Sequence, residues 1–298
     1  MLEYIKAVFY GIIEGITEWL PISSTGHLIL FERFWNFASS PEFIDMYRVV
    51  IQLGAIMAVV LLFFTNIWPF GFSKNSLNSS DKKFGAFALK WDVFNLWLKI
   101  LAACIPTIIY AFLLDDKVSE FLAAEIGATG FKYDFLVVLT MLVLVGVLFI
   151  IIENRNKNAT IKTENVLSIT YKQALIIGAF QLIAAMLPGT SRSGATIIGA
   201  LIIGVSRAAA AEFTFYLAIP VMFGASLYKG YKFLGSGVGI TNSEIVVLII
   251  GMVVAFAVSL VVIKFLMSYI KKHDFKVFGM YRIILGLVLL GYLLISVL

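Results

Sequence analysis

The sequence EGITEWLPISSTGHL, residues 14–28, places two carboxylates, a proline, several hydroxyl side chains and a histidine close together near the start of the chain. The rest of the chain is strongly apolar: 61% of its 298 residues are hydrophobic, 14% are charged, and the mean hydropathy is +0.97. Polar groups inside such a sequence are costly unless they are paired or hydrated. This stretch therefore indicates polar chemistry inside an otherwise apolar fold.

The composition indicates an integral membrane protein. Soluble domains carry about a quarter charged residues, and a bilayer span needs roughly 20 apolar residues. The apolar runs here are continuous, whereas a β-barrel would need short alternating strands. We therefore predict an all-α integral membrane protein with six transmembrane helices, at residues 43–65, 93–114, 131–153, 208–230, 243–268 and 278–298.

Two further apolar segments are interrupted by polar residues. Residues 2–37 are broken by PISSTGH, and residues 171–206 are broken by PGTSRSG. Each half is short for a span, so each segment is predicted to form a re-entrant helical hairpin. Such broken backbone is tolerated at membrane depth only where it is buried in protein or lines a wet cavity.

The two hairpins resemble each other at an offset of 167 residues, which aligns Pro21 with Pro188, Ser24 with Ser191 and Glu14 with Gln181. An offset of 170 then aligns Glu42 with Glu212. We predict one membrane domain, residues 1–298, built from two repeats at about 1–153 and 171–298. Each repeat holds one hairpin and three spans, and because three is odd, the second copy must be inverted.

Basic residues in the loops predict the orientation. Most lysines and arginines outside the hairpins fall in loops on the side opposite the N-terminus, and such loops are cytoplasmic in most membrane proteins. Both termini and the mouth of the first hairpin are thus predicted to face the exterior or periplasm of a bacterial cell (plasma or inner) membrane. Because the positive charge lies in these loops, nucleic acid is not an expected partner.

Glu14 and Glu18 are four residues apart and share one helix face. Two carboxylates this close repel, so either one holds a proton or a cation bridges them. We predict a metal site at Glu14 and Glu18. A surface pair near the lipid headgroups is the alternative.

The first break also supplies Ser23, Ser24, Thr25 and His27. A hydroxyl after Pro21 can cap the next half-helix, whose free N–H groups favour an anion. These hydroxyls serve either as caps alone or as ligands of a substrate. His27 stands at a helix break beside two glutamates, which favours a role as nucleophile or general acid/base.

The second break supplies an arginine where the first has none. Arg192 is suited to bidentate binding of phosphate, or it serves as counter-ion for Glu14 or Glu18. The surrounding residues are predicted to bind substrate, the glycine by close backbone approach and the others through their hydroxyl groups: Gly189, Ser191, Ser193 and Thr196.

The motifs EGITEWLPISSTGHL and PGTSRSGAT, followed by GVSRAAAAEFTFYLAIPVMFGA, closely resemble the undecaprenyl-diphosphate phosphatase family, also called bacitracin-resistance proteins. The likeness covers essentially the whole chain. It implies a membrane hydrolase that removes one phosphate from a polyprenyl diphosphate lipid, recycles the carrier for peptidoglycan and the cell wall, and requires Mg²⁺ or Ca²⁺. By position, the family's acidic motif falls on Glu14 and Glu18, its hydroxyl and histidine on Ser24 and His27, and its arginine motif on Ser191, Arg192 and Thr196.

The mechanism remains open at the level of sequence. Ser24 activated by His27 or Glu18 is the first candidate nucleophile, with water and His27 itself as alternatives, and Arg192 would stabilise developing charge.

A transporter or flippase of the polyprenyl phosphate carrier is the competing class, because inverted repeats with broken helices are typical of transporters. Small glycine-rich faces would also permit a homodimer.

Overall fold

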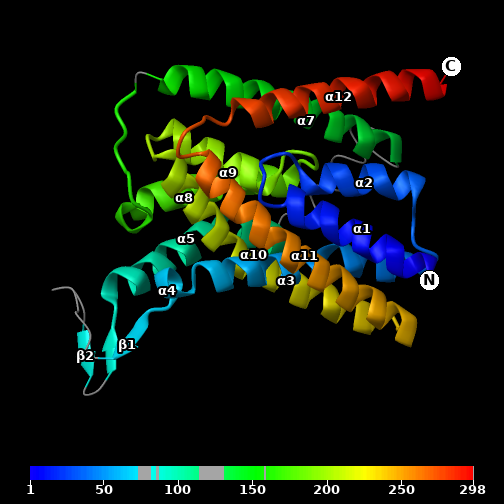
Figure 1. Cartoon of the computed structure of the whole chain (residues 1–298), viewed down its shortest axis with the longest axis horizontal. Helices are drawn as coiled ribbons and strands as arrows, with labels where there is room; N and C mark the ends of the chain where they lie inside the picture. The colour runs from blue at the N-terminus through cyan, green and yellow to red at the C-terminus, as the bar shows by residue number, and fades with distance from the viewer. Residues whose placement is uncertain (73–81, 85–86, 114–130, 158, 298) are drawn as a thin grey trace.

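The computed structural model describes residues 1–72, 82–84, 87–113, 131–157 and 159–297. This part of the chain is almost entirely helical (Figure 1). The helices are α1 (Leu2–Thr17), α2 (Ser24–Phe34), α3 (Pro41–Leu62), α4 (Phe64–Ile67), α5 (Trp91–Leu113), α7 (Phe131–Asn156), α8 (Tyr171–Met186), α9 (Arg192–Ile202), α10 (Arg207–Gly235), α11 (Asn242–Tyr269) and α12 (Lys276–Val297), with a 3-10 turn at Val166–Ser168.

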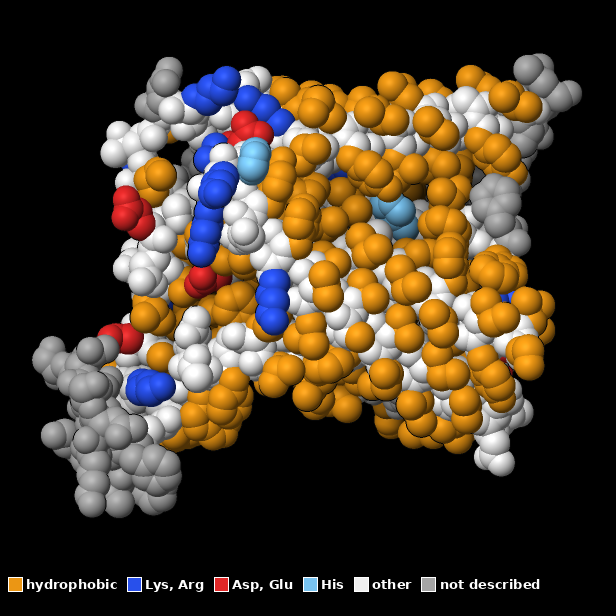
Figure 2. All heavy atoms as spheres, in the orientation of Figure 1, with side chains coloured by type: hydrophobic (Ala, Val, Ile, Leu, Met, Phe, Trp, Pro, Cys, Tyr) orange, Lys and Arg blue, Asp and Glu red, His pale blue; other side chains and the backbone are white. Residues whose placement is uncertain are grey.

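Six of these helices are long and apolar enough to cross a membrane. They are Pro41–Leu62, Trp91–Phe112, Phe135–Asn156, Arg207–Gly235, Asn242–Tyr269 and Lys276–Ile295. Each lies within a few residues of a predicted span, which confirms a multi-pass helical membrane protein. Hydrophobic side chains cover most of the face in Figure 2, and lysine and arginine gather at one end of it.

Both chain termini lie at the same end of the molecule, opposite the turn between α11 and α12 (Figure 1). That turn carries three of the basic residues behind the predicted orientation, Lys271, Lys272 and Lys276. The acidic loop at residues 115–130, on the side predicted to be external, lies outside the described residues. The arrangement is compatible with external termini, and the orientation itself stays a prediction.

A small antiparallel sheet lies within residues 65–92, between α4 and α5. Its strands are β1 (Phe70–Phe72), β2 (Lys82–Phe84) and β3 (Phe87–Leu89), in the order β1-β3-β2. It projects from the end of the bundle near α4 and the start of α5 (Figure 1). The sheet is an addition to the predicted all-α architecture and lies away from the broken helices.

The two broken segments fold as pairs of half-helices. Lys6 near the start of α1 donates a hydrogen bond to the carbonyl of Asn36, just after α2. Lys162 and Thr163, just before α8, contact Gly204, just after α9. The chain therefore enters and leaves each pair at one end, as a re-entrant hairpin requires. Re-entrant insertion of the two hairpins into the bilayer and the inverted repeat stay predictions with which this geometry is compatible.

The first helix of each hairpin packs on a long helix from the other half of the chain. α1 lies along α11, and α8 lies along α5. Glycines allow this close approach: a Cβ at Gly11 would meet the Gly251 carbonyl oxygen at 2.7 Å, and a Cβ at Gly178 would collide with the backbone of Ala103. Gly11 and Gly178 are aligned by the 167-residue offset, so equivalent positions make equivalent crossings.

Candidate active site

Each hairpin turn ends at a serine with left-handed backbone. Ser23 has φ 77° and Ser191 has φ 71°. Both are N-caps: Ser23 Oγ accepts from Gly26 N at 3.2 Å, and Ser191 Oγ accepts from Gly194 N at 3.2 Å. The equivalent residue of Ser191 is thus Ser23 and not Ser24, because the second turn has one more residue between its proline and its cap. The offset from the caps onward is 168 rather than 167.

Glu18 joins the two turns. Ser24 and Arg192 are the first residues of α2 and α9, and each donates to one oxygen of the Glu18 carboxylate. The distances are 2.6 Å from Ser24 Oγ to Oε2 and 3.1 Å from Arg192 Nη2 to Oε1. The carboxylate is 5% exposed and the arginine side chain 13%. A hydroxyl, a buried carboxylate and a guanidinium from two distant motifs therefore form one cluster.

The backbone around this cluster is also fixed. Arg192 Nη1 donates to the Thr214 carbonyl at 3.0 Å, and Ser193 Oγ donates to the Glu18 carbonyl at 3.1 Å. The N-termini of α2 and α9 both lie at the cluster, and their free N–H groups and dipoles favour an anion there. With Arg192 available as a cation, the arrangement can bind a phosphate group beside the Ser24 hydroxyl.

Glu14 lies next to this cluster without a hydrogen-bond partner of its own. Its side chain is fully buried, and neither carboxylate oxygen has a hydrogen-bond partner within the described residues. A carboxyl group in that setting needs a proton or a cation. A hard divalent cation takes six or more oxygen ligands, and both Glu18 oxygens already accept from Ser24 and Arg192. Among the described residues, no group of three or more His, Cys, Asp or Glu side chains is placed to hold a metal. Glu14 is thus the carboxylate of this cluster whose oxygens are free to ligate a cation.

Of the two groups predicted to activate Ser24, Glu18 accepts its hydrogen bond, whereas no hydrogen bond joins His27 to Ser24 among the described residues. The Nδ1 of His27 lies 2.7 Å from the Ser23 carbonyl oxygen, and its Nε2 lies 2.8 Å from the Tyr281 hydroxyl. Because a carbonyl only accepts, Nδ1 carries the proton and Nε2 accepts from Tyr281. Both ring nitrogens are engaged, which places His27 as a residue that braces the first turn.

The predicted substrate-binding hydroxyls are mostly engaged within the protein. Ser23 and Ser191 are caps, as described above. Thr196 Oγ1 donates to the Arg192 carbonyl at 2.9 Å and accepts from Thr214 Oγ1 at 2.9 Å. The side chain of Thr25 lies outside the described residues. Ser24 is the predicted hydroxyl that the structure places directly on the acidic group.

Gly189 has φ +88°, and a Cβ there would lie 2.7 Å from Val138 Cα on α7. Its carbonyl accepts a hydrogen bond from Arg282 of α12. Arg282 and its neighbour Tyr281 are therefore two site residues that sequence reasoning missed. The signal was present: Arg282 is the single charged residue of the predicted span 278–298, and such residues are expensive unless they have partners.

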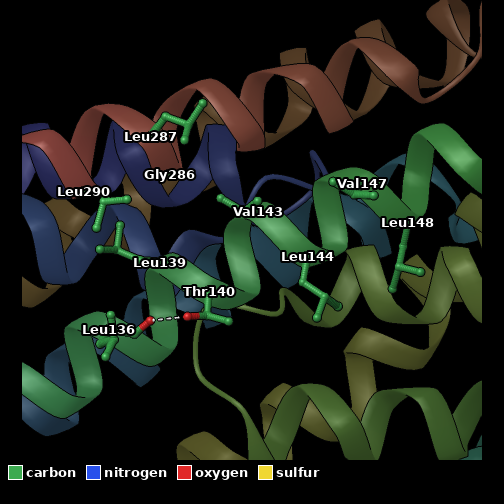
Figure 3. Close-up of a pocket in the computed structure, with 10 residues that line it drawn as sticks. All are labelled: Leu136, Leu139, Thr140, Val143, Leu144, Val147, Leu148, Gly286, Leu287 and Leu290. Carbon is green, nitrogen blue, oxygen red and sulfur yellow. Dashed lines mark hydrogen bonds between the residues drawn. The ribbon is translucent and has the colours of Figure 1, made fainter.

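An apolar groove of about 560 Å³ lies between α7 and α12 (Figure 3). Its polar side chain, Thr140, donates its hydroxyl hydrogen bond to the Leu136 carbonyl of the same helix at 2.9 Å. The remaining lining is aliphatic apart from Gly286, including exposed Leu144 and Leu287. The groove offers hydrocarbon contact and no charge, so it is distinct in chemistry from the polar cluster.

These features define a class: a multi-pass helical membrane protein with a buried serine, glutamate and arginine cluster assembled from two broken helices. Comparison with known proteins gives the family. The model of the bacitracin resistance protein BacA family matches residues 7–288, and the chain belongs to this family.

Individual relatives are similar over nearly their whole length. The chain is 53% identical over 294 residues to the undecaprenyl-diphosphatase of Acetivibrio thermocellus, covering 99% of each chain. It is 54% identical over 289 residues to the undecaprenyl-diphosphatase of Enterococcus faecalis, covering 97% of this chain and 96% of the relative. It is 53% identical over 294 residues to undecaprenyl-diphosphatase 1 of Clostridium acetobutylicum, covering 99% and 98%.

Proposed function

We propose that this protein hydrolyses undecaprenyl diphosphate to undecaprenyl phosphate and inorganic phosphate within the membrane. The observation that carries the proposal is the cluster in which Ser24 and Arg192 both donate to the Glu18 carboxylate. Relatives with the same activity in their names, about 50% identical over nearly full length, support it. The substrate's diphosphate would meet the cluster while its prenyl tail remains among lipid chains.

In the first step, the terminal phosphate displaces Glu18 as the partner of Arg192, whose planar guanidinium suits phosphate oxygens. Ser24 Oγ then attacks the terminal phosphorus. Its proton passes to Glu18 Oε2, the atom 2.6 Å away. The bond from phosphorus to the bridging oxygen breaks, and the lipid monophosphate leaves with that oxygen and the proton that Glu18 releases.

In the second step, water attacks the phosphoserine. Glu18 takes a proton from the water and returns one to Ser24 Oγ, so inorganic phosphate is released and the enzyme is restored. Arg192 and the helix N-termini stabilise the negative charge in both steps. Direct attack by water, with Glu18 as base, is the alternative route, and trapping of phosphoserine separates the two. His27 is a weaker candidate nucleophile because both its nitrogens are engaged by Ser23 and Tyr281.

We further propose that Glu14 would help to hold Mg²⁺ or Ca²⁺ beside the diphosphate. Glu14, with two carboxylate oxygens that lack hydrogen-bond partners, is the residue available to the cation. A bound divalent cation would offset phosphate charge. Activity that persists at full rate in excess chelator would contradict this assignment.

The cellular role follows from the reaction. Hydrolysis at the outer face of a bacterial cell membrane would recycle the lipid carrier for peptidoglycan synthesis, contribute to cell wall and cell shape, and give resistance to bacitracin.

Because the basic residues gather at the opposite end of the molecule (Figure 2), we infer that both termini are external. A homodimer is a further proposal: Gly251 and Gly286 pack inside the chain, whereas Gly224 and Gly291 have open space before them.

The alternative function is transport of the polyprenyl phosphate carrier across the membrane. The favourable observation is the pair of half-helix turns brought together from two halves of the chain. A hydrolysis-inactive variant that still moves the lipid monophosphate across vesicles would support it.

The deciding experiment is phosphate release by the purified full-length protein from undecaprenyl diphosphate in detergent, with and without a chelator. The proposal predicts one phosphate released per lipid. Absence of release by well-folded protein supplied with Mg²⁺ and with Ca²⁺ would refute the enzyme assignment and favour the transporter.

A further inference from the structure

Arg282 on α12 is a fully buried arginine that contacts both hairpin turns. Its Nη1 lies 3.2 Å from the Pro21 carbonyl oxygen in the first turn. Its Nη2 lies 2.8 Å from the Gly189 carbonyl oxygen and 3.0 Å from that of Thr190 in the second turn. Longer contacts reach α7, where Nε lies 3.4 Å from the Leu142 carbonyl oxygen. One guanidinium thereby links α7, α12 and both turns.

The two turn carbonyls on Arg282 are equivalent by position. Pro21 lies two residues before the cap Ser23, and Gly189 lies two residues before the cap Ser191. Three residues after each carbonyl comes a residue that donates to Glu18: Ser24 after Pro21, and Arg192 after Gly189. The spacing is the same in both copies, so the distance between the turns determines the distance between the two groups that meet on Glu18.

We propose that Arg282 is a positioning residue that sets the distance between Ser24 and Arg192 for catalysis. A guanidinium is a rigid planar fork with five donors, so adjacent nitrogens hold two acceptors at a fixed separation. Lysine presents a compact ammonium on a flexible stem and does not reproduce that separation. This inference rests on the proposed function, because it gives the spacing a catalytic purpose.

The partners of Arg282 support a role at the site beyond packing. Within the described residues, the Arg282 guanidinium donates hydrogen bonds to five acceptors. All five are backbone carbonyl oxygens, and none is a carboxylate. By contrast, Arg207, which also ties helices together, is paired with buried Glu153 through bonds of 2.6 to 3.1 Å. A buried cation without a carboxylate partner adds positive potential where the anionic substrate would bind.

The test compares Arg282→Lys with wild type in purified full-length protein in detergent. Misplacement of reacting groups by about 1 Å can lower a rate roughly 100-fold. We therefore expect kcat for phosphate release to fall about 100-fold. KM should change less than about threefold, because Arg192 and the helix N-termini still bind phosphate. Hydrogen–deuterium exchange of peptides covering 18–28 and 186–196 should rise in both turns.

Arg207→Lys is the matched control, because it makes the same substitution in an arginine that joins helices away from the site. It should lower the melting temperature while kcat, KM and exchange in both turns stay at the wild-type values. If Arg282→Lys fails to insert, Arg282→Gln carries the same test, because glutamine has one terminal nitrogen in place of the two that contact the two turns.

Wild-type kcat and wild-type exchange in Arg282→Lys would overturn the proposal. It would equally be overturned if kcat fell no more than in Arg207→Lys at equal loss of stability, or if neither Arg282 variant folded. The exchange measurement needs no turnover. If wild-type protein released no phosphate, the proposed function would fail, and the catalytic purpose of Arg282 with it. Increased exchange in both turns would then still establish Arg282 as the residue that spaces them.

Discussion

Replacing Ser24 by alanine removes one hydroxyl from the cluster and is the sharpest perturbation of the proposed chemistry. The hydroxyl makes one hydrogen bond, 2.6 Å long, to Glu18 Oε2. Its loss should cost about 1.5 to 3 kcal/mol of stability, the range for a hydrogen bond to a charged group. Loss of a nucleophile is far more severe for turnover, by comparison with serine hydrolases, so we expect phosphate release to fall on the order of 10³-fold or more.

Ser23→Ala is the matched control, because it removes the same group one residue earlier. Ser23 Oγ accepts from Gly26 N and caps α2, and it makes no contact with Glu18 among the hydrogen bonds described. Loss of such a cap costs about 1 kcal/mol. Ser23→Ala should therefore melt at a slightly lower temperature but retain turnover within about threefold.

The assay measures phosphate release and melting temperature for both variants, and then traps intermediates with substrate labelled in its terminal phosphate. Acid quenching of wild-type protein should leave label on a peptide containing Ser24, and Ser24→Ala should leave none. Full turnover in Ser24→Ala would refute the serine mechanism and transfer the nucleophile's role to water. Equal loss in both serine variants would instead indicate that the turn has collapsed.

Three further predictions concern the same cluster. Arg192→Met leaves buried Glu18 without its cation, so thermal unfolding should show a loss of about 3–5 kcal/mol, and an unchanged melting curve would contradict the pairing. Gly189→Ala places a Cβ 2.7 Å from Val138 Cα at φ +88°, so it should destabilise by at least 1–2 kcal/mol in the same assay; a neutral result would argue against the close turn. His27→Gln should keep phosphate release within about tenfold of wild type, whereas a loss near 10³-fold would restore this residue as base or nucleophile.

The sequence predicts the helices of this protein well because membrane spans depend on length and hydropathy. The two hairpins are also predictable, since Pro21 and Pro188 interrupt apolar segments at points rich in polar groups. Glu18 and Arg192 attract attention for the same reason: a charge inside an apolar run requires a partner. A pairing of Arg192 with Glu14 or Glu18 is one of the two roles that the sequence predicts for the arginine.

Other features depend on tertiary contacts that spacing alone does not encode. The second turn has one more residue than the first between its proline and its cap, so Ser191 is equivalent to Ser23 rather than to Ser24. The hydrogen bonds of the two caps reveal this equivalence. The contact of His27 is set by Tyr281, which lies 254 residues away in the chain. Arg282 looks from the sequence like a residue near the start of the last span. Its function is visible only once carbonyls from two turns converge on it.

The central claim is that Glu18 is the shared acid–base group of a hydrolytic site formed by both turns. Glu18→Gln tests it most directly, because the amide keeps the shape of the carboxylate but lacks its charge and its basicity. Measured as phosphate release from undecaprenyl diphosphate by purified protein of wild-type melting behaviour, its turnover should fall on the order of 10³-fold or more. Turnover within a few fold of wild type would contradict the account.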